Sequence, residues 1–314
     1  MTSLVVETPG LLTTVQDLGR IGFGPAGVSP SGAADPIALR LGNLLLGNPP
    51  DAAALEMTLL GGAFFFPDGG AIAVTGADFA PTASGRPIEM WTSHTIAPGT
   101  TLKFASTRNY ARCYLAVAGG IRVPLFLGSA STHLVSGLGG FEGRALRKGD
   151  ILQIGEAQKK DSERRLSQVA LYSLKPRKKL RATDGPQTDK FSEEVKLSFF
   201  RTLFRVSEES NRLGIRLEGA HPLTSVAVEM ITEGVTWGAV QITPSGQPII
   251  LGVEQQTTGG YPKIANVIGA DLHRLGQLRP RDEFRFERIP LAVARSLWIE
   301  QERLLNNPSQ LFVV

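Results

Sequence analysis

The feature that most constrains the fold is a succession of short apolar runs, each ended by a turn, from residue 55 to residue 154. Turns such as 67–70 and 97–99 contain Pro and Gly, and the first also contains Asp. The 35 glycines and 20 prolines among 314 residues also favour many short strands over long helices. A closed or nearly closed barrel satisfies the edges of such strands. The predicted strands are 63–66, 71–75, 88–92, 101–105, 111–117 and 151–154.

A second series of strand-like runs begins after residue 190. Its members have the same mixture of β-branched and aromatic residues and the same turn-rich connections. The predicted strands are 199–206, 214–217, 227–231, 239–242, 249–253 and 281–288.

Three helices are predicted between and after these strands. Asp35 is a suitable N-cap, and Pro36 suits the first position of a helix that Gly47 ends. A second helix is predicted over 264–275 from its apolar residues at helical spacing. The third begins at Pro290 and continues through residue 305. Its predicted buried side consists of Leu291, Leu297, Trp298 and Leu304.

Three short segments of the first half recur in the same order in the second half. Segments 75–77, 84–88 and 146–152 resemble segments 237–239, 245–249 and 278–284. The last segment comes later in the first half because a glycine-rich excursion, 127–143, precedes it. This pattern predicts two related barrels, the first with an insertion. Chance recurrence of common turn residues is the alternative.

Basic residues concentrate in one segment, 159–181. It holds nine Lys or Arg residues against Asp161 and Glu163, although the whole chain carries a formal net charge of +4. The excess is therefore local, which does not favour nucleic acid as a partner. We interpret the segment as a solvated linker, with an acidic partner surface as the alternative. The predicted domains are 1–158 (N-terminal β-barrel with a glycine-rich insertion), 159–190 (basic linker) and 191–314 (C-terminal β-barrel with a C-terminal helix).

The single cysteine, Cys113, lies in an apolar run and is predicted to fill the core. One cysteine cannot build a disulfide framework, which fits a reducing compartment. The N-terminus has no basic region followed by a long apolar region, and no apolar segment reaches membrane length. We therefore expect a cytoplasmic protein.

Several kinds of site are excluded by spacing. The four histidines are far apart in the sequence and none accompanies a cysteine pair, so no metal site is expected. A P-loop, a Rossmann fingerprint and a Gly-x-Ser-x-Gly elbow are all absent from the sequence.

The remaining chemistry lies in polar side chains beside glycines, most densely in 247–262. Its Thr-Thr-Gly-Gly run, 257–260, could turn hydroxyls and backbone N–H groups towards one carboxylate, carbonyl or phosphoryl oxygen if the glycines adopt positive φ. An ordinary hairpin turn is the alternative. The candidate catalytic residues are Glu254, Thr258 and Tyr261. The candidate substrate-binding residues are Gln16, Asp17, Arg20, Arg205, Ser207, Arg212, Thr257, Gly259 and Gly260.

Five segments resemble, in order, the allophanate hydrolase subunit 2 family, also called the biotin-dependent carboxyltransferase-like family: 13–20, 115–121, 139–144, 205–214 and 256–262. The resemblance extends over nearly the whole chain. It implies a mainly β fold class with two cyclophilin-like β-barrel domains and a few short helices. One departure is Glu254, where members commonly have Asp, so the carboxylate reaches about one C–C bond further.

The family includes the C subunit of bacterial 5-oxoprolinase and Kip antagonist proteins. The resemblance implies an enzyme component that is inactive alone and opens 5-oxo-L-proline to L-glutamate together with the B subunit, which is Kip-inhibitor-like, and the A subunit. It implies that ATP is used through the complex. Biotin is not expected on this chain, which has no Met-Lys attachment site.

Two other functions stay open within the resemblance. One is the carboxyltransferase component of a biotin-dependent amide or urea carboxylase. The other is a non-catalytic antagonist of a Kip-inhibitor-like partner. The first would act on a small-molecule amide, as 5-oxoprolinase does, and neither involves nucleic acid or a membrane.

Overall fold

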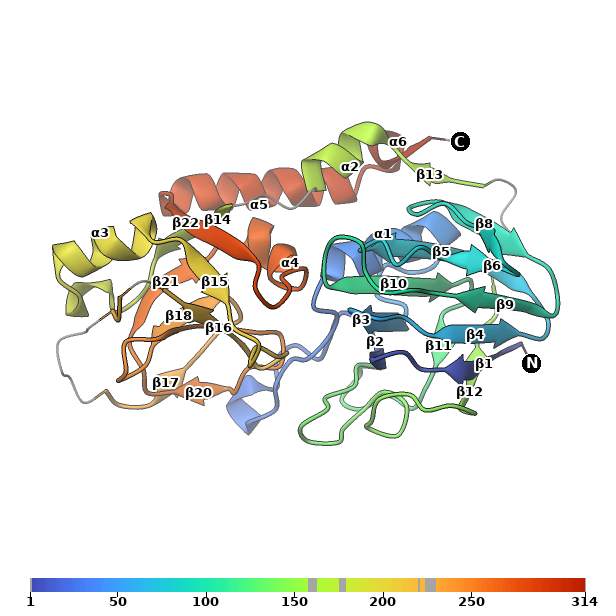
Figure 1. Cartoon of the computed structure of the whole chain (residues 1–314), viewed down its shortest axis with the longest axis horizontal. Coiled ribbons are helices and arrows are strands. Elements are labelled where there is room, and N and C mark those ends of the chain that lie inside the picture. The colour runs from blue at the N-terminus through green and yellow to red at the C-terminus, as the bar shows by residue number, and fades with distance from the viewer. Residues whose placement is uncertain (1, 158–162, 175–178, 220, 224–229, 314) are drawn as a thin grey trace. The chain divides into compact units, whose positions relative to one another are not determined.

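The computed structural model describes every residue except 1, 158–162, 175–178, 220, 224–229 and 314 (Figure 1). Strands predominate and the helices between them are few and mostly short, which confirms the mainly β prediction. The chain forms two compact units. Unit 1 contains 1–20, 31–174 and 307–314, and unit 2 contains 21–30 and 175–306. Within the described part of the chain, no helix combines the length and the apolar character needed to span a membrane.

Unit 1 is built on two sheets, with strand orders β11-β12-β1-β4-β9-β6-β7 and β2-β3-β10-β5-β8. Both sheets contribute to one core, in which Phe64 and Leu152 of the first meet Leu55, Val74 and Leu115 of the second. Alternate residues of each strand face this core. The strands are Ser3–Thr8 (β1), Leu12–Gln16 (β2), Ala54–Thr58 (β3), Ala63–Phe66 (β4), Gly70–Gly76 (β5), Thr82–Ala83 (β6), Arg86–Pro87 (β7), Ser93–Ile96 (β8), Thr100–Lys103 (β9), Arg112–Val117 (β10), Ile121–Arg122 (β11) and Ile151–Ile154 (β12).

Cys113 is fully buried in this core. Burial raises the pKa of its thiol well above the ordinary value, and the negative charge of Asp78 raises it further. The thiol is therefore a packing group, as the apolar run around it predicted.

Helix α1 (Pro36–Leu46) covers the outer face of the second sheet. Asp35 Oδ1 accepts from the N–H of Ala38 at 2.9 Å, and Gly47 ends the helix with a φ of 75°. Leu39 and other apolar residues of α1 pack against Tyr114 and its neighbours on β10. The predicted N-cap, first position and C-cap are all confirmed, because each depends only on local chemistry.

Unit 2 is a closed barrel with strand order β14-β21-β18-β19-β16-β15-β22, beside a two-stranded ribbon of β17 and β20 (Figure 1). Aromatic residues fill one end of the barrel, where Phe199 stacks on Phe286 with ring centroids 4.6 Å apart. The barrel strands are Lys179–Asp184 (β14), Phe204–Val206 (β15), Gly214–Glu218 (β16), Ala239–Ile242 (β18), Pro248–Leu251 (β19), Lys263–Val267 (β21) and Glu283–Arg288 (β22). The ribbon strands are Glu233–Gly234 (β17) and Thr258–Gly259 (β20).

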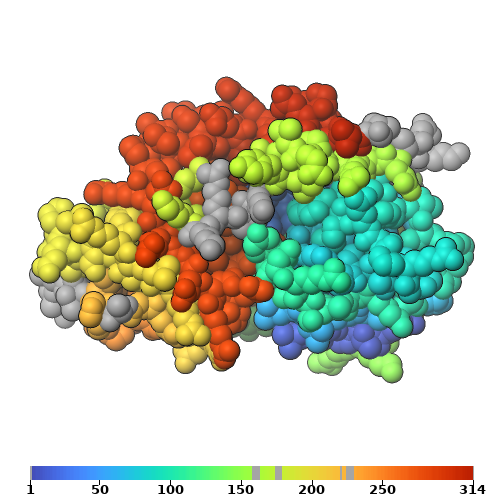
Figure 2. Space-filling view, turned by 45° about the horizontal axis from the view of Figure 1, so that its top comes forward, coloured from blue at the N-terminus to red at the C-terminus, as the bar shows by residue number. Residues whose placement is uncertain are grey.

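The remaining short elements lie around these sheets. In unit 1, the N–H of Ser167 donates to the carbonyl of Leu311 at 2.7 Å and so ties α2 to α6 at the surface (Figures 1 and 2). Unit 1 contains Arg165–Leu166 (β13), Gln168–Leu174 (α2), Pro308–Leu311 (α6) and Phe312–Val313 (β23). Unit 2 contains Gly24–Ala26 (η1), Thr188–Lys190 (η2), Glu193–Arg201 (α3), Gly269–Asp271 (η3), Leu272–Leu275 (α4) and Leu291–Leu305 (α5).

The internal repeat is visible as the same turn in both units, at 147–150 and 279–282. In each turn the final aspartate accepts from the backbone N–H three residues earlier, at 2.7 Å in the first and 2.9 Å in the second. The residue before it has a positive φ, 90° at Gly149 and 71° at Arg281. The second turn has Arg281 where the first has a glycine. A positive φ favours glycine, yet the second turn keeps the same conformation.

Equivalent strands hold these two turns. The N–H of Val6 on β1 donates to the carbonyl of Asp150, and the N–H of Val206 on β15 donates to that of Asp282, both at 2.9 Å. Antiparallel pairing follows in each unit, between β1 and β12 and between β15 and β22. The two halves therefore share this turn and the antiparallel strand pair beside it.

Three predicted elements are wrong in type or extent. Residues 88–92 form no strand, and β8 begins only at Ser93. Residues 193–201 form helix α3, so only the end of the strand predicted over 199–206 exists, as β15. Residues 263–267 form strand β21, and only the short η3 and α4 follow where a helix over 264–275 was predicted. Pairing of β21 with β14 and β18 outweighs its helical spacing.

The interpretation of 159–190 as a linker is also wrong for part of its length. Strand β14 pairs with β21 and β22 and is required to close the barrel of unit 2. Residues 158–162 and 175–178 lie outside the described residues, as does most of the strand predicted over 227–231. Helix α5 begins and ends as predicted, but Leu291 and Trp298 are exposed, and Ala294 and Leu305 are its buried residues.

Candidate functional site

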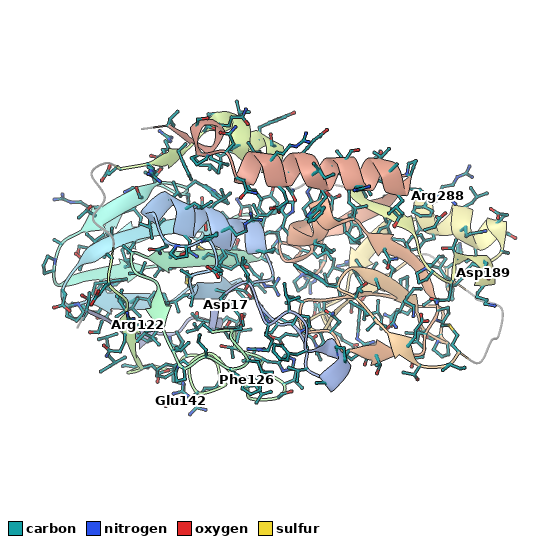
Figure 3. All side chains as sticks on the ribbon, turned by 180° about the vertical axis from the view of Figure 1, so that it is seen from behind. Asp17, Arg122, Phe126, Glu142, Asp189 and Arg288 are labelled. Carbon is teal, nitrogen blue, oxygen red and sulfur yellow. The ribbon has the colours of Figure 1, made fainter. Side chains whose placement is uncertain are left out.

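Asp17 is buried directly after β2 and fixes the first part of the glycine-rich excursion of unit 1. Its Oδ1 accepts from Ser129 Oγ at 2.7 Å and from Ser131 Oγ at 2.5 Å. The N–H of Gly19 donates to the same oxygen at 2.7 Å, and the N–H of Ala130 donates to Oδ2 at 2.6 Å. With both oxygens occupied by internal donors, this carboxylate orders the neighbouring loop, in which Figure 3 labels Phe126.

Gln16 and Arg20 contact the same loop as Asp17. Gln16 Nε2 donates to the carbonyl of Thr132 at 3.1 Å. The buried Arg20 guanidinium donates to the carbonyl of Ser131 and lies over the ring of Phe126, with 5.5 Å between Cζ and the ring centroid. The structure therefore brings together Gln16, Asp17 and Arg20, which were predicted to bind substrate, and each of them contacts residues 126–132.

Arg212 and Glu254, two of the candidate residues that lie in unit 2, form a buried ion pair. Arg212 Nε lies 2.6 Å from Glu254 Oε1, and both side chains are almost fully buried. The backbone adds a second link, because the N–H of Glu254 donates to the carbonyl of Arg212 at 2.9 Å. This pair joins the loop before β16 to the loop after β19. The catalytic role of Glu254 stays a prediction.

Arg205 and Ser207 are close in sequence but differ in setting. Arg205 is exposed on β15, between residues that face the barrel core. Ser207 is buried, and its N–H donates to the carbonyl of Arg216 at 2.9 Å. The structure therefore keeps Ser207 near the Arg212 loop and points Arg205 to the surface. Their roles in substrate binding stay predictions.

The Thr-Thr-Gly-Gly run adopts a conformation other than the predicted one. Thr258 and Gly259 form β20 and pair with β17, and neither Gly259 nor Gly260 has a positive φ. Thr257 accepts at its carbonyl from the N–H of Val235 at 3.1 Å. The predicted nest of N–H groups is wrong, since an extended strand directs successive N–H groups to opposite sides. Thr258 and Tyr261 are exposed, Thr257 and Gly260 are half-buried, and Gly259 is buried.

Two polar residues missed by the sequence analysis lie directly beneath this ribbon. Gln241 on β18 and Lys263 on β21 are register partners, and both are 3% exposed. The signal for Gln241 was a single amide within an otherwise apolar strand, 239–242. Lys263 follows directly on the 256–262 segment that carries the family resemblance.

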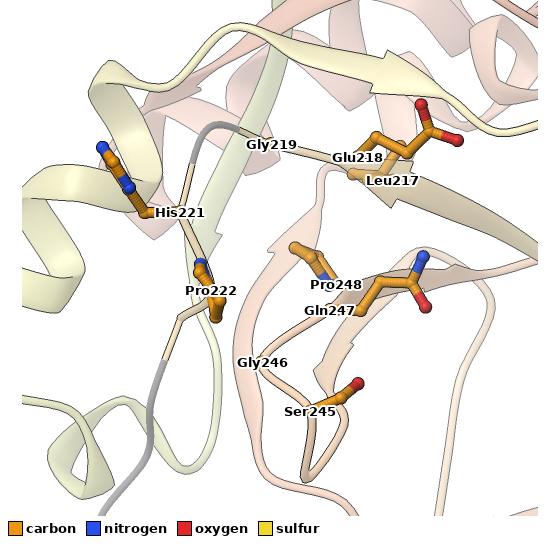
Figure 4. Close-up of a pocket in the computed structure, with 9 residues that line it drawn as sticks. All are labelled: Leu217, Glu218, Gly219, His221, Pro222, Ser245, Gly246, Gln247 and Pro248. Carbon is orange, nitrogen blue, oxygen red and sulfur yellow. The ribbon is translucent and has the colours of Figure 1, made fainter.

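A cavity of about 270 Å³ lies elsewhere in unit 2, between the end of β16 and the turn joining β18 to β19 (Figure 4). Its polar lining residues include Glu218, His221 and Gln247. None of the predicted site residues lines it. Within the described ranges, no group of three or more His, Cys, Asp or Glu residues is placed to hold a metal ion.

Comparison with known proteins connects both units to one family. The model of the carboxyltransferase domain, subdomain A and B, matches residues 26–288. The chain belongs to this carboxyltransferase family. The match includes the Arg212–Glu254 pair, the ribbon and Lys263, and it begins after Gln16, Asp17 and Arg20.

Two curated members of the carboxyltransferase family are similar over most of their length. The 5-oxoprolinase C subunit of Escherichia coli is 38% identical over 302 residues, which cover 96% of each chain. That of Haemophilus influenzae is 37% identical, with 93% of each chain covered. Among solved structures, the urea amidolyase of Kluyveromyces lactis has a TM-score of 0.89 at 32% identity. The matched region covers 97% of this chain and 20% of the urea amidolyase chain.

Proposed function

We propose that this chain is the C subunit of an ATP-dependent 5-oxoprolinase, which opens the lactam of 5-oxo-L-proline to give L-glutamate. The observation that carries the proposal is the 38% identity to the Escherichia coli C subunit over 96% of both chains. A relative that matches over nearly the whole of both chains supports a shared role better than a match to one part of a larger enzyme does.

The proposed partners are the B subunit, which is Kip-inhibitor-like, and the A subunit of the same enzyme. We propose that the chain alone does not catalyse the reaction and that ATP is used by the assembled complex. The sequence contains no Met-Lys pair, which supports the absence of biotin from this chain. Donor groups in this chain, arginine and lysine above all, would bind and orient the substrate's anionic oxygens.

The test combines the purified chain with the A and B subunits and leaves out one component at a time. ATP hydrolysis stimulated by 5-oxo-L-proline is expected only in the complete mixture. Co-purification with the B subunit should accompany it. Stimulated hydrolysis by this chain alone, or equal hydrolysis by the other two subunits without it, would reject the proposal.

The structural likeness to urea amidolyase favours one alternative, a carboxyltransferase component that works with carboxybiotin on another protein. The same mixtures can be supplied with urea in place of 5-oxo-L-proline, together with a biotin carboxylase and its biotinylated carrier. Transfer of labelled bicarbonate to urea that depends on this chain would support the alternative. Its absence, with 5-oxo-L-proline active, would support the main proposal.

A further inference from the structure

The outer face of β18 and β21 carries two buried polar side chains, Gln241 and Lys263, and we call the place where they meet the β17–β20 ribbon the recess. Val240 and Ile242 face the barrel core, so Gln241 between them points to the opposite side of the sheet. Lys263 is its cross-strand partner and lies on the same face. The recess is therefore built on two barrel strands, which hold its side chains more rigidly than a loop would.

One wall of the recess is the backbone of Gly259. A Cβ atom at this position would lie 2.6 Å from Gln241 Nε2 and 3.2 Å from Val235 Cγ1. Gly259 does not have a positive φ, so its backbone conformation would admit a side chain, but a Cβ here would push the Gln241 amide from its position. A side chain at position 259 would occupy the space into which this amide points.

Gln241 has a polar atom with no hydrogen-bond partner. Its Nε2 is buried, and no group in the described part of the chain accepts from it. Buried amide groups are nearly always paired, and an unpaired one in a native protein needs an explanation. A ligand oxygen in the recess would provide the missing acceptor.

Lys263 already binds a carboxylate at the mouth of the same recess. Its Nζ lies 2.5 Å from Glu233 Oε1, and Lys263 is 3% exposed whereas the Glu233 side chain is 43% exposed. Gln187 Nε2 also donates to Glu233 Oε1, at 2.7 Å. The hydrogen bonds from Lys263 and Gln187 lower the pKa of Glu233 below its ordinary value. Lys263 is thus the buried member of the pair. The partly exposed Glu233 carboxylate can turn out into water without a further desolvation penalty.

We propose that this recess is a binding site for a small carboxylate. The oxygens of the ligand accept from Lys263 Nζ and Gln241 Nε2, and Glu233 turns outward as the ligand enters. The exchange keeps the charge balance, because one carboxylate replaces another beside the buried ammonium group. The recognition follows from these contacts alone. Assigning it to the carboxylate of 5-oxo-L-proline rests on the proposed function.

Ligand binding to the full-length chain, alone and in complex with the A and B subunits, tests this site. The probes are 5-oxo-L-proline, acetate and 2-pyrrolidinone, which has the lactam without the carboxylate. Calorimetric titration is expected to show binding of the two carboxylates, and 2-pyrrolidinone should bind at least about tenfold more weakly than 5-oxo-L-proline. No carboxylate binding by either preparation would overturn the proposal.

Three variants give the site a signature that a merely structural role would not produce. Lys263→Met and Gly259→Ala are each expected to weaken 5-oxo-L-proline binding about tenfold or more. Glu233→Gln removes the competing carboxylate and is expected to tighten it about threefold or more. The matched controls are Lys179→Met, an exposed lysine on β14, and Gly234→Ala, where a Cβ would meet nothing within 4 Å.

The outcomes separate the site from the proposed function. If folded Lys263→Met and Gly259→Ala bind 5-oxo-L-proline like the wild type, the site is wrong even if the complex is active. If one variant fails to fold, the other decides. If the complex does not open 5-oxo-L-proline but the chain binds acetate through Lys263, the site is right and the proposed function is wrong.

Discussion

Replacing Asp17 by alanine is expected to lower the free energy of unfolding by about 3 to 4 kcal/mol. The carboxylate accepts from two hydroxyls and two backbone N–H groups in a buried position. Alanine would leave those donors buried without their acceptor, which costs more than the loss of an exposed hydrogen bond. Urea denaturation followed by fluorescence measures the change.

The control for this variant is Asp68→Ala, in the exposed turn between β4 and β5. It is expected to change the free energy of unfolding by less than about 0.5 kcal/mol. Limited proteolysis should cut the Asp17→Ala variant within 126–143 faster than the wild type, because that segment loses its anchor. Equal stability of the two variants would contradict the structural role given to Asp17.

Removing Glu254 is expected to be similarly severe. Glu254→Ala should lower the free energy of unfolding by about 3–5 kcal/mol, because the Arg212 guanidinium stays buried after losing this carboxylate. The double replacement Arg212→Met with Glu254→Leu should recover most of that loss, since an apolar pair of similar volume needs no counter-charge. Urea denaturation of the single and double variants gives the coupling energy.

An exposed ion pair in the same unit provides the comparison. Asp184 and Arg288 are each about half exposed, and Asp184→Ala should cost less than about 1 kcal/mol. A Glu254→Ala variant as stable as Asp184→Ala would show that the buried pair is not a structural link. If the double variant is stable and its complex inactive, the pair also serves function.

A structural feature could be predicted from the sequence where neighbouring residues alone determine it. Asp35, Pro36 and Gly47 define α1 through caps that need no tertiary contact, and the prediction was confirmed. Helix α3 was missed although Ser192 caps it, because Phe199 and Phe200 had the composition of a strand. Such a run is ambiguous until its packing is known.

The candidate site shows the same division. The residues around Asp17, and separately the Arg212–Glu254 pair, were found because polar residues beside glycines stand out in the sequence. The partners of Asp17 in the glycine-rich excursion, such as Ser131, are more than 100 residues away and could not be read from spacing. The conformation of Gly259 was predicted wrongly, because pairing with β17 is a tertiary contact. Lys263 was missed because only the fold shows that it is buried.

The most direct test of the account is formation of L-glutamate from 5-oxo-L-proline and ATP by this chain with the A and B subunits. The account predicts that glutamate forms together with ADP when all three chains are present, and that omission of this chain abolishes it. Glutamate formation at an undiminished rate without this chain, or none with all three chains present, would contradict the account.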